Sequence, residues 1–425
     1  MNVGSTKLTK SVRAIAVASA AVIAAIAGTA AIAPMASAAA DFYTPPASIS
    51  SARGQVIKSE PMPLLLQIPG LPNQWPGTAQ RVMYTSQYQD GTPAAVTGTF
   101  VQPTAAWTGK GPQPTVVIGP GTVGQGDQCA PSKMMSFPMS VDLNQRSIGV
   151  NYVALEMNNL LLRGVRVFVT DYIGLGTPGI HTYVNRIEEG HAMLDGARAA
   201  LNLAGAPKNS PVGFEGYSQG GGAAASAAEM AQSYAPDLNV KGTYAGAPPA
   251  DLRSVLRQVD GTAIVGVIGF AINGLEARYP LVRKVVDAET SPEGKAVLAR
   301  LANSCVGDII LQYPFQHTSS WTRTGESLSQ VIDRHPELNS VFDDQRIGNL
   351  KPNAPVFVEG GTNDDIIPYG QVKQMVADWR AKGANVEFVT NSTPPILPGL
   401  VINHATPMLT TLLPGEDFIL AQFNR

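Results

Sequence analysis

The stretch that decides the fold is PVGFEGYSQGGGAAASAAEM, residues 211–230, which passes from a short apolar run through glycines into an alanine-rich segment. The apolar run has strand spacing, and the composition after it favours a helix. Between them, Gly216 and Gly220 flank Ser218 in the pattern G-x-S-x-G, the pattern of a nucleophile elbow. An ordinary tight turn is the alternative. The strand before and the helix after favour the elbow, which makes Ser218 the candidate nucleophile and aims free N–H groups of the helix at a developing negative charge.

Strand-like runs alternate with helical patterns through much of the chain, which predicts a mostly parallel sheet covered by helices. A hairpin comes first, with strands at 80–89 and 94–102 around Asp90-Gly91. Besides the strand before Ser218, we predict buried strands at 114–118, 165–169, 240–244, 355–359 and 386–390, and helices at 187–203, 219–234, 371–382 and from Thr406 onward.

The alternation stops after the sixth predicted strand, between about residues 249 and 350. Helical patterns at 263–275, 292–302 and 328–335 predict a helical insertion there. The first of these is apolar on more than one face and too short to span a bilayer, which leaves two interpretations: a helix that touches lipid, or the buried centre of the insertion. The predicted organisation is a core at 39–250, a helical cap or lid at 251–350, and the rest of the core at 351–425.

Residues 1–38 have the features of a secretory signal peptide. Three basic residues lie within 1–13, an almost wholly apolar run follows at 14–33, and Ala36-Ser37-Ala38 matches an A-x-A cleavage site. We therefore expect a secreted protein, extracellular or in the cell envelope. A retained membrane anchor is the alternative, because an apolar run of this length can also cross a bilayer.

Composition and charge argue against several classes of partner. The formal net charge is −2, only 15% of residues are charged, and no basic cluster exists, so no nucleic-acid partner is expected. The five histidines include no i, i+4 pair, and the two cysteines lack the spacing of a metal knuckle, so we expect no metal and no cofactor. Cys129 and Cys305 are an even pair in a chain predicted to be exported, which favours a disulfide over two free thiols.

A serine nucleophile needs a base, and an α/β-hydrolase presents its triad in the chain order serine, acid, histidine. Two of the five histidines precede Ser218, and two fall inside the predicted insertion. Only His404 remains, in the stretch INHATP, which we place in a loop between the last strand and the last helix. The prediction is that His404 is the general base; a capping or surface histidine is the alternative.

The acid is expected after the strand at 355–359, where the sequence continues as GGTNDDIIP. Asp364 and Asp365 both qualify at this point of the argument. One of them orients the imidazole and stabilises its cationic form, and the other faces solvent or forms a turn.

Some polar residues near the predicted site have no place in this triad. Glu215 lies in a strand expected to be buried, where an unpaired carboxylate is costly, so it either has a partner or reaches the site. We favour a structural role for it. Asp171 and His181 follow another strand, and we expect them to hold loop structure.

Six pieces of the chain resemble the secreted lipases of actinobacteria and yeasts, the family that includes lipase A of Candida antarctica. They span nearly the whole chain after residue 40. The pieces are DFYTPP at Asp41, GDQCAPS at Gly126, DYIGLGTPG at Asp171, GYSQGG at Gly216, GTNDDIIPYG at Gly361 and NHATP at Asn403.

The resemblance implies an α/β-hydrolase core with a helical lid, hydrolysis of lipid esters, and a disulfide from the cysteine of CAPS to the lid. Cys129 and Cys305 fit that pairing. In the family pattern D-x-x-x-P-Y the aspartate is catalytic, and the pattern falls on Asp364, Pro368 and Tyr369 here. The resemblance thus favours Asp364 over Asp365.

The same resemblance implies an oxyanion hole made by the N–H of the residue after the nucleophile, Gln219, and by a residue of the loop before CAPS. In that glycine-rich loop we assign Thr122. Some family members carry an acidic residue there, whereas this chain has none before Asp127, which puts side-chain assistance to the hole in doubt.

These observations lead to a secreted serine hydrolase of lipid esters, a triacylglycerol lipase or esterase with the triad Ser218, His404 and Asp364. Its expected partners are the lipid ester substrate and, transiently, a lipid interface. Two alternatives remain open: an acyltransferase of the cell envelope with the same triad, and a non-catalytic lipid-binding envelope protein.

Overall fold

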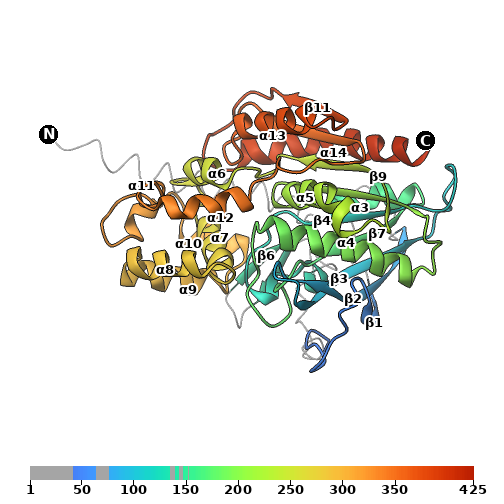
Figure 1. Cartoon of the computed structure of the whole chain (residues 1–425), viewed down its shortest axis with the longest axis horizontal. Helices are drawn as coiled ribbons and strands as arrows, with labels where there is room; N and C mark the ends of the chain where they lie inside the picture. Colours follow the sequence, from blue (N-terminus) through green and yellow to red (C-terminus); the bar gives the residue numbers. More distant parts are fainter. Residues whose placement is uncertain (1–41, 64–75, 135–138, 143–146, 152) are drawn as a thin grey trace. The chain divides into compact units, whose positions relative to one another are not determined.

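A nine-stranded sheet forms the framework of the chain (Figure 1). The computed structural model describes residues 42–63, 76–134, 139–142, 147–151 and 153–425. The strand order is β1-β2-β3-β7-β4-β8-β9-β10-β11. The strands are β1 (Val56–Met62), β2 (Gly77–Gln87), β3 (Pro93–Pro103), β4 (Thr115–Gly119), β7 (Arg166–Thr170), β8 (Pro211–Tyr217), β9 (Asn239–Gly246), β10 (Val356–Gly361) and β11 (Val386–Asn391).

The six strands from β7 to β11 in this order pair in parallel, and β1, β2 and β3 add an antiparallel edge. The predicted hairpin is β2 and β3, and every other predicted strand lies in the sheet. A separate antiparallel pair consists of β5 (Met139–Asp142) and β6 (Ser147–Val150). The predicted fold class, a mostly parallel sheet with helices, is confirmed.

Strand β1 has no counterpart among the predicted strands. Its sequence, VIKSEPM, lacks a continuous apolar run, because this edge strand is only partly buried and contains charged residues and a proline. The helical segment follows β9, which is the sixth predicted strand and, with β1 counted, the seventh strand of the sheet in chain order.

Helices cover both faces of the sheet. On one face, α4 (Arg186–Leu203) and α5 (Gln219–Tyr234) pack against alternate residues of β4, β7 and β8, and α13 (Tyr369–Ala381) packs against β10. On the other face, α3 (Val153–Leu162) and α14 (Ile402–Phe423) pack against the intervening strand residues, whose side chains point to that face. The period of two along each buried strand thus divides its apolar side chains between two cores. The short helix α2 (Pro131–Met134) precedes β5.

Helix α14 begins at Ile402, four residues before the predicted start, and contains Pro407 and Pro414. The predicted loop position of His404 is therefore wrong, because His404 lies in the first turn of this helix. The early start has a tertiary cause: the carboxylate of Asp365 accepts hydrogen bonds from the backbone N–H groups of Val401 and His404. A distant carboxylate thus satisfies donors at the helix start that a capping side chain would otherwise satisfy.

The segment between β9 and β10, all of it described, contributes no strand to the sheet. Figure 1 shows its helices together at one side of the sheet. The predicted helices correspond to α7, α9 and α11. The full set is α6 (Leu252–Val259), α7 (Gly266–Glu276), α8 (Pro280–Glu289), α9 (Pro292–Leu301), α10 (Val306–Gln312), α11 (Leu328–Asp333) and α12 (Asn339–Asp344), with 3-10 turns at Thr318–Ser320 and Pro336–Leu338.

A disulfide and a β-bridge join this helical segment to the loop after β4. The predicted bond between Cys129 and Cys305 is present, with a Cα–Cα distance of 5.5 Å. Beside it, Gly124 pairs with Cys305, and the N–H of Val306 donates to the carbonyl of Val123 at 2.8 Å. The loop that contains Thr122 is therefore tied to the helical segment by covalent and backbone bonds.

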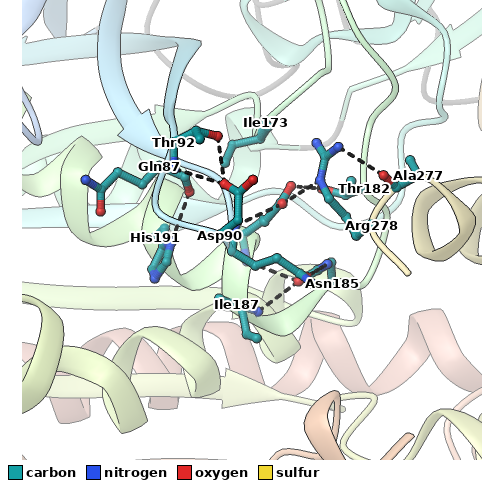
Figure 2. A network of polar contacts seen from close by, with 12 residues as sticks. Gln87, Asp90, Thr92, Ile173, Thr182, Asn185, Ile187, His191, Ala277 and Arg278 are labelled. Atoms are coloured by element: carbon teal, nitrogen blue, oxygen red, sulfur yellow. Dashed lines mark hydrogen bonds and ion pairs between the residues drawn. The ribbon is translucent and has the colours of Figure 1, made fainter. Parts of the chain in front are cut away.

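A polar network forms a second attachment (Figure 2). Arg278, two residues after α7, donates from Nε to Oε1 of Glu188 in the first turn of α4 at 2.6 Å. Glu188 also accepts from Thr182 Oγ1 and from the N–H of Gln89 in the β2–β3 turn. The side chain of Asn185 caps α4 beside them. The buried carboxylate of Glu188 thus joins the helical segment and the hairpin to the start of α4.

The predicted signal peptide, residues 1–38, lies outside the described residues and stays a prediction. Within the part of the chain that the structure describes, none of the helices combines the length and the apolar character needed to cross a bilayer.

Three carboxyl groups are buried between the sheet and the helices α3 and α14. They belong to Glu156 of α3, Glu215 of β8 and Glu416 of α14. Burial raises the pKa of Glu156 to about 8 and that of Glu416 to about 7, and burial with both neighbouring charges raises the pKa of Glu215 well above its usual value. Among the described residues, neither oxygen of Glu215 has a hydrogen-bond partner. Glu215 is therefore uncharged in the folded protein near neutral pH.

We predict that Glu215→Gln stabilises the protein increasingly as pH rises. Below the carboxyl pKa of the unfolded chain, about 4.3, both states are protonated and Glu215 carries no ionisation penalty. Above it the unfolded chain releases the proton while the folded protein keeps it, so folding stability falls until pH passes the folded pKa, by at most about 1.4 kcal/mol per pH unit. An amide removes this dependence.

Urea unfolding of the wild type and of Glu215→Gln from pH 5 to pH 8 measures the difference between their free energies of unfolding. This difference should increase with pH. Glu387→Gln, at an exposed position on β11, is the control and should give a constant difference. A constant difference for Glu215→Gln as well would show that the buried carboxyl does not titrate as inferred.

Candidate active site

The predicted strand, sharp turn and helix are present around Ser218. Ser218 joins β8 to α5 with φ 59° and ψ −122°, a left-handed conformation that costs an ordinary residue of order 1–3 kcal/mol. The flanking glycines are required sterically. A Cβ on Gly220 would lie 1.9 Å from the carbonyl oxygen of Gly119 in β4, and one on Gly216 would lie 2.3 Å from the backbone of Gly220. The strained serine is thus fixed by backbone packing on both sides.

His404 and Asp364 form a buried hydrogen-bonded pair. The Nδ1 of His404 lies 2.8 Å from Oδ2 of Asp364, and the other carboxylate oxygen accepts the N–H groups of Ile366 and Ile367, both at 2.8 Å. Because a carboxylate only accepts, Nδ1 carries a proton, and in the neutral imidazole Nε2 is then the basic nitrogen. The two backbone bonds hold the carboxylate in place behind the ring.

Asp365 holds the backbone of the same histidine. Its Oδ1 accepts the N–H of His404 at 3.2 Å, and its Oδ2 accepts the N–H groups of Gly399 and Val401 at 2.9 and 3.2 Å. The sequence left open which aspartate meets the imidazole. In the structure the ring bonds Asp364, and Asp365 bonds the loop and helix start that present the ring.

The charges around the imidazole favour its protonated form. Burial by itself lowers the pKa of His404, whereas the hydrogen-bonded Asp364 raises it. Asp365 and Glu359 add further negative charge, and the net pKa of His404 lies above its ordinary value of 6.5. A histidine that becomes cationic readily while bonded to a fixed carboxylate is suited to accept a proton from a hydroxyl.

Tyr217 links Ser218 to this pair. It directly precedes Ser218, and its hydroxyl donates to the backbone carbonyl of His404 at 2.7 Å, with the two rings 5.2 Å apart. Among the described residues, the buried Nε2 of His404 has no hydrogen-bond partner, so Ser218 Oγ does not donate to it in this state. Catalytic hydrogen bonds are often loose before substrate binds, and the free nitrogen remains available.

Ser218 opens into a cavity with apolar walls. Every lining residue that the helical segment supplies is apolar, from α6, α7, α8, α11 and α12. The apolar stretch of α7 therefore forms a cavity wall, which supports the buried alternative for it. The polar lining residues all come from the core: Thr122, Tyr183 and Ser218 lie between elements, and Gln219 is the first residue of α5.

The side chain of Gln219 is locked beneath the cavity. Its amide nitrogen donates to Oε1 of Glu189 at 2.7 Å and lies 3.0 Å from Nε2 of His181. Burial lowers the pKa of His181 to about 4, so the ring is neutral; its Nδ1 donates to the carbonyl of Ile173 and leaves Nε2 as an acceptor. Both amide protons of Gln219 are thereby used, which fixes the residue that follows Ser218.

Sequence reasoning left Tyr183 and Glu189 without a role and gave His181 only a loop role. All three follow β7 in the stretch from DYIGLGTPG into α4, and that position after a parallel strand was the available signal. Within the described residues, no group of three or more His, Cys, Asp or Glu side chains is arranged to hold a metal ion.

Comparison with known proteins places the chain in a family. A family model described as secretory lipase matches residues 139–411, more than half of the sequence. The chain belongs to the secretory lipase family. The resemblance seen in the sequence is thereby confirmed, and so, at the level of the family, is the expected lipase-type ester hydrolase.

Individual relatives of this secretory lipase agree on the fold but differ in their described activity. A Mycobacterium tuberculosis protein named "Probable inactive lipase" is 30% identical over 360 residues, which cover 82% of this chain and 75% of the relative. A secreted triacylglycerol lipase of Malassezia furfur is 31% identical over 305 residues, or 70% and 75% of the two chains. The closed-state structure of Candida antarctica lipase A covers 93% of this chain and 87% of its own, at 24% identity and TM-score 0.75, and supports the α/β-hydrolase fold.

We predict that Asp364→Asn damages activity far more than Asp365→Asn. At position 364 an amide turned toward the ring favours the wrong imidazole tautomer, a change worth on the order of 10⁴ in rate in a well-studied triad. At position 365 an amide keeps one acceptor oxygen for the backbone, so we expect a lower melting temperature and a modest loss of kcat.

The two variants are matched controls for each other, since both replace one carboxylate of the same turn by an amide. Rates on a short-chain ester and melting curves separate the two effects. A larger rate loss for Asp365→Asn would reverse the assignment of the pair.

Proposed function

We propose that this secretory lipase is a secreted serine hydrolase that cleaves carboxylic esters of lipids. The observation that carries the proposal is a serine on a strained elbow that opens into an apolar cavity, with a histidine–aspartate pair attached to the neighbouring Tyr217. In the proposed reaction Ser218 attacks the ester carbonyl while His404 Nε2 takes the hydroxyl proton. The imidazolium then gives that proton to the leaving alcohol, and water releases the acid from the acyl-enzyme.

The remaining groups stabilise the charges that develop during the reaction. Asp364 stabilises the imidazolium, and the backbone N–H of Gln219 at the start of α5, together with Thr122, stabilises the oxyanion of the tetrahedral intermediate. The helical segment, residues 251–350, is proposed as a cap whose apolar walls receive the acyl chain. This assignment of catalysis to the core and acyl binding to the cap agrees with the lining of the cavity, which has polar residues only on the core side.

An exposed apolar rim beside the cavity is proposed to contact the lipid surface. Leu311 and Phe315 of the cap and Ile396 and Leu397 of the loop before α14 are all more than a third exposed. The two groups meet at residues 262–263, where Phe315 N–H donates to Thr262 O and Ala263 N–H donates to Gly399 O. Between Glu387 and Glu416 the only titratable side chain is His404, which is buried, so the loop part of this surface suits a neutral lipid better than a charged one.

A non-catalytic lipid-binding protein is the rival that one observation favours, namely the name of the mycobacterial relative. All three proposed triad positions are filled here, and the histidine–aspartate bond is formed. Substitution of the nucleophile decides between the two.

We predict that Ser218→Ala abolishes ester hydrolysis and leaves the fold intact, because Oγ forms the acyl-enzyme and its removal hardly changes side-chain volume. Purified mature protein would be assayed on p-nitrophenyl esters, with a melting curve for each form. Ser226→Ala, in a buried serine of the same helix, is the control and should keep its activity. Activity of Ser218→Ala within tenfold of wild type would refute the assignment, and an inactive wild type would support the binding protein. An alcohol in the assay distinguishes transfer, which yields a new ester, from hydrolysis.

We predict that the double variant Cys129→Ser/Cys305→Ser loses long-chain hydrolysis more than short-chain hydrolysis. The bridge closes a sequence separation of 176 residues, and its loss is worth roughly 5 kcal/mol at most in the chain-entropy model. A long acyl chain needs the cap wall, whereas an acetyl group needs only the triad and the oxyanion hole. Rates across a series of acyl lengths, measured below the variant's melting temperature, test this. Equal losses at every length would show that the bridge does not shape the acyl site.

A further inference from the structure

A group of charged side chains joins the end of α8 to the residues that follow α11. The ring of His335 lies between two carboxylates: Nε2 donates to Oε1 of Glu289, the last residue of α8, at 3.0 Å, and Nδ1 donates to Oε1 of Glu337 at 2.9 Å. The neighbouring Arg334 donates to both carboxylate oxygens of Glu289, at 2.9 and 3.4 Å. We call these four residues, Glu289, Arg334, His335 and Glu337, the latch.

The two hydrogen bonds of the His335 ring require a cationic imidazole. A carboxylate only accepts hydrogen bonds, and a neutral imidazole has a single N–H, so only the doubly protonated ring serves both partners. The carboxylates of Glu337 and Glu289 also raise the pKa of His335 above its ordinary value of 6.5. When pH rises through that pKa, the ring keeps one of its two bonds, and the nitrogen without a proton faces a carboxylate oxygen.

Further charged side chains surround the latch. They include Glu326, which pairs with Arg334 at 2.8 Å, Lys284 of α8, which acts on Glu337 through its charge, and the pair of Asp333 in α11 with Arg257 in α6. Arg334 stays charged throughout, so deprotonation of His335 weakens the latch but leaves the bond between Arg334 and Glu289 in place. The latch therefore has a stronger and a weaker form that differ by one proton.

The latch connects two parts of the apolar cavity wall. The backbone N–H of His335 donates to the carbonyl of Ile332 at 3.0 Å, and the carbonyl of His335 accepts the N–H of Leu338 at 2.9 Å; both partners line the cavity. On the other side, Glu289 ends the helix that supplies Val285 and Val286 to the lining. Figure 1 shows α8 and α11 at the end of the helical segment that lies away from the sheet, whereas Ser218 lies at the start of α5.

We propose that the latch sets the length of the acyl chain that the cavity accepts, with His335 as the specificity-determining residue. The cationic ring draws α8 and α11 together and closes the part of the cavity distant from Ser218, which favours short chains. The neutral ring lets the two helices separate more easily, so a long chain fits between them, whereas a short chain does not reach this wall. The inference rests on the proposed function. His335 is a positioning residue in this scheme, because it acts through the two helices.

The test measures the ratio of kcat/KM for p-nitrophenyl dodecanoate to kcat/KM for p-nitrophenyl butyrate from pH 5 to pH 9. Both esters depend equally on the protonation of His404, so the ratio removes that titration. In the wild type the ratio should rise about two- to fivefold as pH passes the pKa of His335, which is the effect of one exposed charged pair.

Three variants define the role of the ring. His335→Gln has no charge and should give the high ratio at every pH. His335→Arg stays charged and can bond two carboxylates, so it should give the low ratio at every pH. His317→Gln is the matched control, because His317 is the other histidine of the helical segment and its exposed ring faces Asp260 at 3.5 Å, outside the latch. This control should keep the wild-type profile.

Thermal stability gives a readout that needs no substrate. Because the pKa of His335 in the folded protein lies above the unfolded value of about 6.5, the ring stabilises the fold below pH 6.5, and this contribution is lost as pH rises through the folded pKa. The excess in melting temperature of the wild type over His335→Gln should therefore shrink from pH 5 to pH 9. A constant excess would overturn the proposal, because the latch would not titrate.

The ester ratios separate the remaining outcomes. A wild-type ratio that stays constant with pH, or a pH-dependent ratio that persists in His335→Gln, would refute this inference alone, since the protein would still be an ester hydrolase. A wild type that hydrolyses neither ester would refute the proposed function and this inference with it. A rising wild-type ratio that becomes flat in both His335 variants, with the profile of His317→Gln unchanged, would support the latch.

Discussion

The structure depends on the close approach of two glycines at the start of α5 to the ends of the neighbouring strands. A Cβ on Gly220 would lie 1.9 Å from the oxygen of Gly119, and a Cβ on Gly221 would lie 2.0 Å from the oxygen of Gly246. The start of α5 is thus wedged between the carboxyl ends of β4 and β9. Ligands of parallel sheets bind at this end of the strands, and here the contact also forces Ser218 into its left-handed conformation. One steric constraint therefore sets the positions of Ser218, of the helix that follows it and of the start of the loop that contains Thr122.

A second set of bonds ties the helical segment to that same loop. The segment from 247 to 355 follows β9, yet it reaches back to residues 123–129 through the Cys129–Cys305 disulfide and the Gly124–Cys305 bridge. Gln125 extends the link, since its amide donates to the carbonyl of Phe270 in α7 and accepts from Asn273. The wall of the cavity and the loop at its polar side are consequently one connected piece. In the proposed reaction, acyl binding and oxyanion geometry are coupled through it.

Much of the fold could be predicted from the sequence, because local sequence patterns indicate it. Buried parallel strands are continuous apolar runs, and the elbow requires its glycines, so β4, β7, β8 and the position of Ser218 follow from spacing alone. Edge strand β1 has no such run, because only one side of it meets the protein. Helix α14 starts before Pro407 because Asp365 satisfies its first N–H groups, and that contact spans 39 residues of sequence. Tertiary bonds of this kind leave no local signal, and for the same reason the contact between Tyr183 and Thr122 could not be predicted from the sequence.

The consecutive aspartates show where the limit of sequence reasoning lies. Both follow β10 in one turn, so spacing and chain order cannot separate them, but their side chains leave the backbone in different directions. Asp364 meets the ring of His404, and Asp365 meets its backbone N–H. Tyr217 completes the arrangement by bonding the carbonyl of the same histidine from the residue before Ser218. His404 is thus held at its ring, its N–H and its carbonyl, and one of these three bonds comes from the elbow itself. The strain at Ser218 and the position of His404 are therefore fixed through adjacent residues, Ser218 and Tyr217.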